Sequence, residues 1–237
     1  MKTEKTRKEI LDSLNGLYET GAVAAGDNGK EIFRAKHTGT GQVFLIKSLA
    51  ESLPVYGFLC GIKCANLPEV YEIYECPDGV VLIEEYVEGE LLSSYLSHHT
   101  PKYREAKLIV AQLCGVLSFL HENGYVHRDI KPENIILCGD TVKLIDFDAA
   151  RVYDTEKTSD TRVLGTVGYA SPEQFGMAQS DGRVDVYALG VLLNVMLTGD
   201  HPSKKLAGGR AGRIVLKCTQ INPDLRYQTV EKLAAAL

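Results

Sequence analysis

The stretch from residue 127 to residue 148 constrains the fold most, because it alternates clustered polar groups with two short apolar runs. It reads His-Arg-Asp-Ile-Lys-Pro-Glu-Asn, then Ile-Ile-Leu, a short turn and Lys-Leu-Ile-Asp-Phe-Asp. Asp129, Lys131 and Asn134 crowd one loop, and Asp146 follows a β-like run. The pattern predicts that three oxygen acceptors and one cation converge on one polyanion and its metal ion.

These four side chains match what phosphoryl transfer requires of a protein, which is mainly positioning and charge stabilisation. Asp129 would orient a substrate hydroxyl and accept its proton as the catalytic base. Lys131 would neutralise charge on the moving phosphoryl group. Asn134 and Asp146 supply the hard oxygen ligands that Mg²⁺ prefers. The sequence therefore predicts metal-assisted phosphoryl transfer.

The segment resembles the catalytic loop and metal-binding motif of eukaryotic-type protein kinases. The resemblance continues at residues 165–173, where Ser171 stands at a position that is usually Ala. Residues 185–190 resemble the start of the buried central helix of the large lobe, and Arg226 stands where the family's ion-pair partner of Glu173 belongs. The amino-acid sequences of these motifs are most similar to those of the eukaryotic-like kinases of Gram-positive bacteria.

The resemblance implies an α+β fold, in which one protein kinase domain of two lobes spans residues 1–237. Residues 1–17 would hold an N-terminal helix, residues 18–87 a small antiparallel β lobe, and residues 88–237 a mainly α-helical lobe. The hinge between the lobes is expected at residues 86–90.

Periodicity of the apolar residues predicts the individual elements. Helical spacing predicts a helix over residues 4–15, and turn residues divide residues 17–49 into three antiparallel strands. Two further strands are expected at 70–74 and 80–85, and helices at 91–98 and 103–122, the last with an apolar face at Leu108, Ala111, Leu113 and Leu117.

The resemblance also implies a nucleotide site. Lys47, at the end of the run Phe-Leu-Ile-Lys, matches the strand lysine that holds the α- and β-phosphates of ATP, and is a third catalytic residue. A lone strand lysine is usually a surface residue, but its position upstream of the hinge and catalytic loop favours the functional interpretation. The expected cofactors are ATP and Mg²⁺, and the expected nucleotide contacts are Gly26, Gly29, Ile32, Leu45, Lys47, Glu85, Val87 and Ile136.

Four departures from the family pattern lie around this nucleotide site. The loop at residues 26–32 lacks the three-glycine spacing, so it relies on backbone N–H groups to hold phosphates. Leu45 occupies a position that is usually small. Glu84 falls at the gatekeeper position, where an ionised carboxylate is costly unless it is paired. The segment after Lys47 is short for the usual regulatory helix.

That short segment, residues 48–65, contains Glu51 as its only acid, and Pro54 is expected to break any helix there. Either the lysine–glutamate pair of an active kinase is absent, or Glu84 supplies the carboxylate from the sheet itself. We predict the second arrangement, with the Glu84 carboxylate within about 4 Å of the Lys47 ammonium.

Asp148 replaces the glycine that usually follows Asp-Phe in this family, and Asp is among the few residues that adopt positive φ. Lys131 and Thr166 stand at positions where serine/threonine-directed kinases have the same residues, which resembles that class more than tyrosine-directed kinases. Thr166 is expected to contact the catalytic aspartate. A phosphate in the cluster of Thr155, Thr158, Ser159 and Thr161 would pair with Arg128.

Charge and cysteine usage narrow the setting. A net charge of −5 over 237 residues offers no basic field for nucleic acid, so ATP and proteins with Ser or Thr are the expected partners. The six cysteines show no zinc-ribbon spacing and are expected to be buried, reduced thiols in the cytoplasm. Neither a signal peptide nor a membrane span is expected.

Two other function classes stay open at this point. The altered phosphate loop and the missing helix glutamate motivate a pseudokinase or regulatory nucleotide-binding module with weak or no transfer activity. A small-molecule phosphotransferase of related fold is the third class. The segment that ends at Ser171-Pro172-Glu173 argues against it, because such enzymes generally lack this segment.

Overall fold

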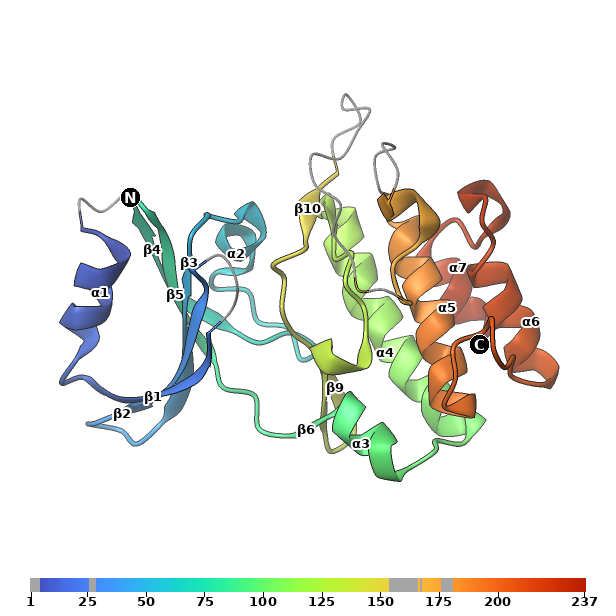
Figure 1. Ribbon diagram of the computed structural model, residues 1–237, viewed down its shortest axis with the longest axis horizontal. Coiled ribbons are helices and arrows are strands. Elements are labelled where there is room, and N and C mark those ends of the chain that lie inside the picture. Colours follow the sequence, from blue (N-terminus) through green and yellow to red (C-terminus); the bar gives the residue numbers. More distant parts are fainter. Residues whose placement is uncertain (1–4, 26–28, 154–165, 167, 176–180) are drawn as a thin grey trace. The chain divides into compact units, whose positions relative to one another are not determined.

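A computed structural model describes residues 5–25, 29–153, 166, 168–175 and 181–237. The chain divides into two compact units, residues 1–87 and residues 88–237, and each is described by itself. The first unit is a small α/β structure, and the second is mainly helical (Figure 1).

The small unit is built on a five-stranded sheet in which every neighbouring pair of strands is antiparallel. The strand order is β1-β2-β3-β5-β4, so β3 and β5 lie next to each other. This sheet confirms the predicted small antiparallel lobe. The elements are α1 (Arg7–Leu14), β1 (Tyr18–Ala25), β2 (Glu31–His37), β3 (Val43–Leu49), α2 (Pro54–Leu59), β4 (Val70–Cys76) and β5 (Gly79–Glu85).

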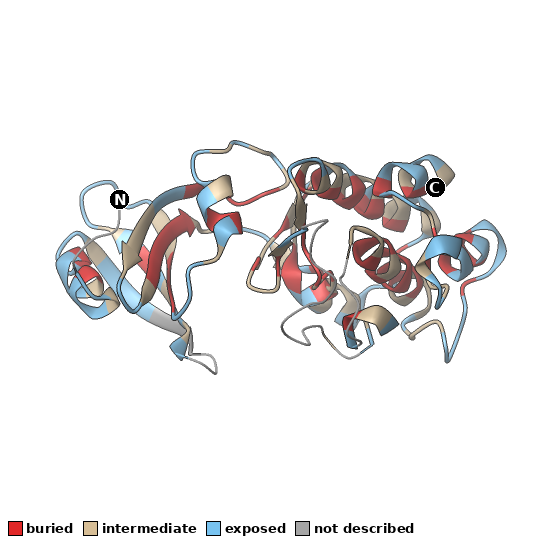
Figure 2. Ribbon diagram, turned by 90° about the horizontal axis from the view of Figure 1, so that it is seen from above, coloured by how far each residue is buried: buried red, intermediate tan, exposed pale blue. Residues whose placement is uncertain are grey.

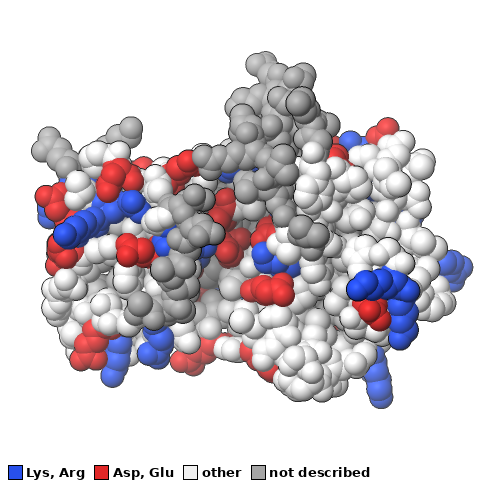
Figure 3. Space-filling view, in the orientation of Figure 1, with Lys and Arg blue, Asp and Glu red and all other residues white. Residues whose placement is uncertain are grey.

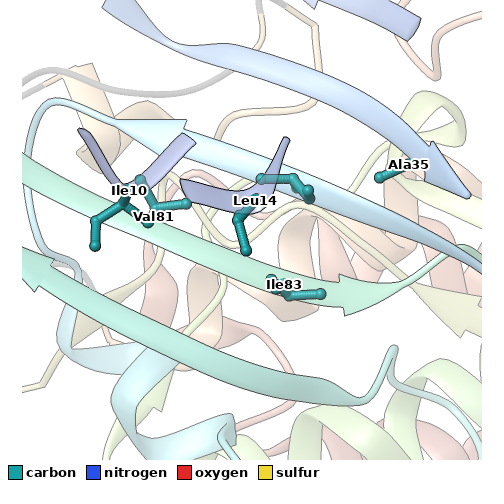
Figure 4. Close-up of a cluster of buried hydrophobic side chains, with 6 residues drawn as sticks. Ile10, Leu14, Ala35, Val81 and Ile83 are labelled. Atoms are coloured by element: carbon teal, nitrogen blue, oxygen red, sulfur yellow. The ribbon is translucent and has the colours of Figure 1, made fainter. Parts of the chain in front are cut away.

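Helix α1 covers one face of this sheet. A capping box starts the helix, because the Thr6 side chain accepts a hydrogen bond from the Glu9 backbone and the Glu9 carboxylate accepts one from the Thr6 backbone. Ile10 and Leu14, four residues apart, then point from one side of the helix into the sheet. They form a buried cluster with Ala35, Ile46, Val81 and Ile83 (Figure 4).

The other face of the sheet carries Lys47. In the antiparallel register, Lys47 lies opposite Ile32 of β2 and Leu82 of β5, so these three side chains share a face. Helix α2 lies on this side of the sheet, away from α1 (Figure 1). The prediction that Pro54 breaks any helix was wrong, because Pro54 is the first residue of α2, where no backbone N–H is needed.

In its described residues, the large unit consists mainly of helices, with one two-stranded and one three-stranded sheet of short strands. Its buried residues gather along the helices, and α5 is buried on nearly all sides (Figure 2). The elements are β6 (Glu90–Leu91), α3 (Leu92–His98), α4 (Tyr103–Glu122), β7 (Tyr125–Val126), β8 (Ile135–Cys138), β9 (Thr141–Leu144), β10 (Arg151–Val152), α5 (Arg183–Thr198), α6 (Gly209–Cys218) and α7 (Val230–Ala236), with short 3-10 turns at Pro132–Asn134, Pro172–Phe175 and Pro223–Leu225.

Two details differ from the sequence expectations. Leu108 of α4 is 57% exposed, because the buried face of that helix runs through Ile109, Leu113 and Leu117 instead. The expectation of buried cysteines holds for Cys114 and Cys218 alone, because Cys60, at the end of the short helix α2, is exposed and the other three cysteines are partly exposed. None of the six cysteines, all of which the structure describes, forms a disulfide. Within the described part of the chain, no helix has the length and apolarity that a bilayer crossing requires.

Candidate active site

The side chains of the predicted catalytic loop converge on Asp129. Thr166 donates a hydrogen bond from its hydroxyl to Asp129 Oδ1 at 2.7 Å, and Lys131 Nζ lies 2.7 Å from Asp129 Oδ2. Lys131 also donates to the Thr166 hydroxyl at 2.7 Å, and Asn134 Nδ2 donates to Asp129 Oδ2 at 2.9 Å. The predicted contact between Thr166 and the aspartate is therefore confirmed. Asp129 is a half-buried carboxylate whose direction is fixed by three neighbouring side chains.

The backbone just before Asp129 is strained and strongly held. Arg128 has φ +70°, a conformation that few non-glycine residues adopt. The buried Asp185 carboxylate accepts hydrogen bonds from the backbone N–H groups of His127 at 3.0 Å and Arg128 at 2.8 Å. Gln174, which is also buried, donates from its side chain to the Arg128 carbonyl at 2.9 Å. Both the backbone N–H and the backbone carbonyl of the strained Arg128 are thus held by buried side chains.

Asp185 is in turn paired with His121 of α4, whose Nε2 lies 2.8 Å from Asp185 Oδ2. Burial by itself would raise the pKa of Asp185, but the hydrogen bond and charge of His121 bring it below its usual value. Burial likewise works against the charged imidazole, yet the Asp185 carboxylate raises the pKa of His121. The pair places a largely buried cation beside the anchor of the catalytic loop.

Asp146 follows β9 and has φ +63°, so the left-handed conformation belongs to this aspartate itself. The expectation about Asp148 is corrected in detail, because positive φ among the described non-glycine residues occurs at Arg128 and Asp146 and not at Asp148. Asp148 donates from its backbone to Asp146 Oδ1 at 3.3 Å. Phe147 is buried against His127, with ring centroids 5.1 Å apart, and burial lowers the pKa of that histidine.

In the small unit, the predicted ion pair between Lys47 and Glu84 is confirmed. Lys47 Nζ lies 2.6 Å from Glu84 Oε1, and both side chains are at most 5% exposed. In the sheet register Glu84 lies opposite Leu45, two residues before Lys47 on β3, so the pair is a diagonal contact across neighbouring strands. The gatekeeper carboxylate is therefore paired, as its burial requires.

The expected nucleotide contacts lie in both units. Ile32 and Leu45 are half-buried and lie on the Lys47 face of the sheet. Glu85 and Val87 follow Glu84 at the end of the small unit, and Ile136 lies half-buried on β8 of the large unit. Gly29 has φ +72°. Gly26, the proposed phosphorylation cluster at residues 155–161 and the flanking Gly165 and Val167 lie outside the described residues.

The predicted ion pair between Glu173 and Arg226 is also confirmed. Arg226 donates to both carboxylate oxygens, at 2.5 Å and 2.8 Å, in the bidentate geometry that suits arginine. The arginine side chain is fully buried and the glutamate side chain is 14% exposed. Arg226 also donates to the backbone carbonyls of Arg183, Gln220 and Ile221. This contact ties the segment at 171–175 to the start of α5 and to the end of the chain.

Sequence reasoning missed three residues that the structure places at these sites. Gln174 stands next to the motif that ends at Glu173, and its burial, which the sequence does not show, was found only in the structure. His121 lies at the end of the amphipathic helix α4, and it reads as an ordinary C-terminal histidine. Tyr56 lies on α2, a helix that was not predicted because Pro54 was taken as a helix breaker. Its ring centroid is 5.6 Å from Lys47 Nζ.

Charges on the surface are mixed. On the face shown in Figure 3, acidic and basic side chains of the described residues are interspersed. The site residues themselves are mostly covered, since Lys47, Glu84 and Asn134 are each at most 5% exposed. The charged groups that matter here are therefore those held inside each unit.

Comparison with known proteins places this geometry in a family. The pattern of the protein kinase domain matches residues 21–235. The chain is 33% identical over 207 residues to serine/threonine-protein kinase PknB of Mycobacterium tuberculosis, and 33% identical over 196 residues to serine/threonine-protein kinase PrkC of Bacillus subtilis. These matches cover 73% and 72% of the chain, but only 33% and 30% of the relatives.

A eukaryotic relative aligns over more of the chain. Serine/threonine-protein kinase cds1 of Schizosaccharomyces pombe is 29% identical over 246 residues, which covers 98% of the chain and 54% of the relative. The chain thus spans about a third of the length of its bacterial relatives. With its catalytic loop, its Asp146-Phe147 motif and its paired strand lysine, the chain belongs to the protein kinase domain family.

Proposed function

We propose that this protein transfers the γ-phosphoryl group of ATP to serine and threonine hydroxyls of proteins. The observation that carries the proposal is the convergence of Thr166, Lys131 and Asn134 on the Asp129 carboxylate. A carboxylate with a fixed direction is what a substrate hydroxyl needs in order to be oriented and deprotonated. The names of the relatives, which are serine/threonine-protein kinases, support the same substrate class.

Each residue of the loop has a separate task in this proposal. Asp129 accepts the proton of the substrate hydroxyl as the oxygen–phosphorus bond forms. Lys131, 2.7 Å from that carboxylate, brings positive charge to the side on which the phosphoryl group moves. Thr166 bridges the two side chains and fixes the distance between them. In the small unit, Lys47 holds the α- and β-phosphates.

We further propose that Asn134 and Asp146 bind Mg²⁺, since an amide oxygen and a carboxylate are the hard donors that this ion prefers. When bound, the ion supplies charge neutralisation at the nucleotide phosphates. Asn134 is buried and lies within hydrogen-bond reach of Asp129, which keeps the proposed metal ligand beside the proposed base. We place the protein in the cytoplasm of a bacterium, because all six cysteines are reduced and several relatives are bacterial.

The decisive experiment is transfer from radiolabelled ATP to a generic protein substrate and to the chain itself, with Asp129→Asn as the matched control. Incorporation that depends on Asp129 supports the kinase. A thermal shift with Mg-ATP, run beside it, addresses the pseudokinase alternative, which the shortened small-unit helix motivates. Stabilisation by Mg-ATP without incorporation would identify a nucleotide-binding module. The absence of both stabilisation and incorporation would contradict both functions.

A further inference from the structure

Two side chains from different elements contact the Lys47 ammonium. The Glu84 carboxylate of β5 lies 2.6 Å from Nζ, and the Tyr56 ring of α2 lies 5.6 Å away at its centroid. A cation within about 6 Å of a ring centroid is attracted by the negative face of the ring, and more strongly where water is excluded. Water is excluded here, because Lys47, Glu84 and Tyr56 are all at most 4% exposed.

The division of roles between sheet and helix is reversed relative to the usual kinase arrangement. In that arrangement a strand lysine pairs with a glutamate from a helix of the small lobe. Here helix α2 reads Pro-Val-Tyr-Gly-Phe-Leu and carries no acidic residue. The helix therefore offers an aromatic ring to Lys47, and the sheet offers the carboxylate.

The position of the carboxylate is set by the backbone of the sheet. Strands β3 and β5 pair in continuous register from Phe44 opposite Glu85 to Leu49 opposite Val80. Lys47 and Glu84 are diagonal neighbours on one face of this ladder, at a separation that long side chains span. Separating the two charges by moving the backbone would require breaking central hydrogen bonds of the sheet, whereas a helix could swing away as a body.

We propose that Tyr56 is a positioning residue for Lys47, and that Glu84, Lys47 and Tyr56 form a permanent clamp that needs no helix movement to assemble. This inference rests on the proposed function only for its catalytic consequence. The clamp fixes the lysine before nucleotide arrives, so control of this protein acts at steps other than the pairing of its lysine. Tyr56 contributes by the electron density of its ring, in addition to its volume.

A fluorinated ring at position 56 tests the clamp without relying on catalysis. The reference is Tyr56→Phe, and the test variant carries 3,4,5-trifluorophenylalanine at the same position, which keeps the shape but removes negative charge from the ring face. The readout is the rate at which an amine-reactive reagent labels Lys47, followed by mass spectrometry. The exposed Lys63 is the internal control, since its side chain is 83% exposed.

The expected result is faster labelling of Lys47 in the trifluorinated variant than in Tyr56→Phe, by roughly 2- to 30-fold, at equal melting temperature and equal labelling of Lys63. Equal labelling of Lys47 in the two proteins would show that the ring only fills space, and would overturn the assignment of Tyr56. Because the pair differs little in shape, a folding defect common to both leaves the comparison valid.

A second pair of variants tests the carboxylate. Glu84→Gln should speed labelling of Lys47 and lower kcat/KM for ATP, whereas Glu51→Gln should change neither. Equal effects of the two substitutions would contradict the clamp. Asp129→Asn should abolish transfer and leave Lys47 labelling unchanged, so a failure of the proposed function and a failure of the clamp give different results.

Discussion

At the scale of single residues, the Asp129 carboxylate is oriented by three side chains within 2.9 Å, and this suggests the sharpest test of mechanism. Asp129→Asn preserves the shape but removes the proposed base, so transfer should fall by about 10²–10⁴-fold. Asp146→Asn should also abolish transfer, and it should weaken Mg²⁺-dependent binding of nucleotide. Radiolabel transfer and nucleotide titration with and without Mg²⁺ measure the two effects. Full activity in either variant would contradict the mechanism.

The pair of His121 and Asp185 predicts a pH dependence of stability. The pKa of His121 is raised, so its contribution is complete below the ordinary histidine value of 6.5 and is lost as the pH rises through the folded-state pKa. The pKa of Asp185 is lowered, so its contribution is present above its ordinary value of 3.8 and is lost in stronger acid. Both contributions are complete between these two ordinary values.

His121→Gln should therefore destabilise the protein more at pH 6 than at pH 8.5, by about 1–3 kcal/mol at the lower pH, the cost of a lost hydrogen bond to a charged group. Denaturant unfolding of both proteins at the two pH values measures this difference. The buried His127 has a lowered pKa, so its protonation in acid also destabilises the protein. Because both proteins contain His127, this effect cancels when their free energies of unfolding are compared. A penalty that does not change with pH would show that His121 stays neutral.

Most residues of the candidate site could be predicted from the sequence, for physical reasons. Asp129, Lys131 and Asn134 lie within six positions, and a loop that short brings polar side chains together in most folds. The ion pair of Lys47 and Glu84 was predictable because each charge needed a partner. Gln174 and Tyr56 were not predictable, because a neutral side chain shows no such need in the sequence.

At the scale of elements, the turn at Pro172–Phe175 is joined to the catalytic loop by one side chain. Gln174 donates to the Arg128 carbonyl at 2.9 Å, and its Oε1 accepts from the Ser171 backbone N–H at 3.0 Å and hydroxyl at 3.2 Å. The serine that replaces the usual alanine at 171 thus has a partner. Through Gln174, the end of this segment holds Arg128, the strained residue before Asp129.

Gln174→Glu should lower kcat with little change in the KM for ATP, because a carboxylate cannot donate to the Arg128 carbonyl. Leaving that buried carbonyl without its donor costs about 1–3 kcal/mol, or roughly 5- to 150-fold in rate if the loop is displaced. Ser171→Ala is the control, and its effect should be smaller, since the backbone N–H of residue 171 still donates. Steady-state kinetics at several ATP concentrations separates kcat from KM. An unchanged kcat in Gln174→Glu would contradict this role.

The ion pair of Glu173 and Arg226 joins elements that are far apart in the sequence. Arg226→Ala removes a fully buried cation and leaves Glu173 and several backbone carbonyls without their donor, so it should destabilise the large unit by about 3–5 kcal/mol. Thermal and denaturant unfolding measure this loss. An unchanged melting temperature would show that the pair contributes nothing, and Arg226→Lys should recover only part of the stability because it cannot bind both oxygens.

Element boundaries were predicted well where periodicity is long, and poorly where one residue decides. The helix at 103–122 was placed at its observed ends, because its 20 residues carry many apolar repeats. Its exposed Leu108 was misassigned, since one leucine near the edge of an apolar stripe gives no information about the angle of that stripe. Pro54 was taken as a helix breaker because proline has the opposite effect at the first helical position and in the interior.

At the scale of the whole molecule, the fold class was implied by the motifs that resemble protein kinases, and the order of strand-like and helix-like segments agrees with it. The division of the chain into units of 87 and 150 residues reflects two separate cores, one around the five-stranded sheet and one around α5. Contacts that join segments more than 50 residues apart, such as His127 with Asp185, have no counterpart in local sequence pattern. The hydrogen bonds from the His127 and Arg128 backbone to Asp185 were found only in the structure, whereas the ion pair of Glu173 and Arg226 was expected from the resemblance to protein kinases.

Helix α1 has a practical consequence, because it precedes the residues that match the protein kinase domain pattern and yet packs on the core of the sheet. The family pattern begins at residue 21, yet Ile10 and Leu14 complete the apolar cluster on the sheet. Burying two such side chains stabilises a protein by roughly 3–6 kcal/mol, which is comparable with the whole stability of many domains. Trimming the chain to residues 21–237 would expose the apolar face of the sheet to water. Such a fragment should therefore aggregate or unfold at a lower temperature than the whole chain. A soluble, equally stable fragment 21–237 would show that the sheet does not need this helix.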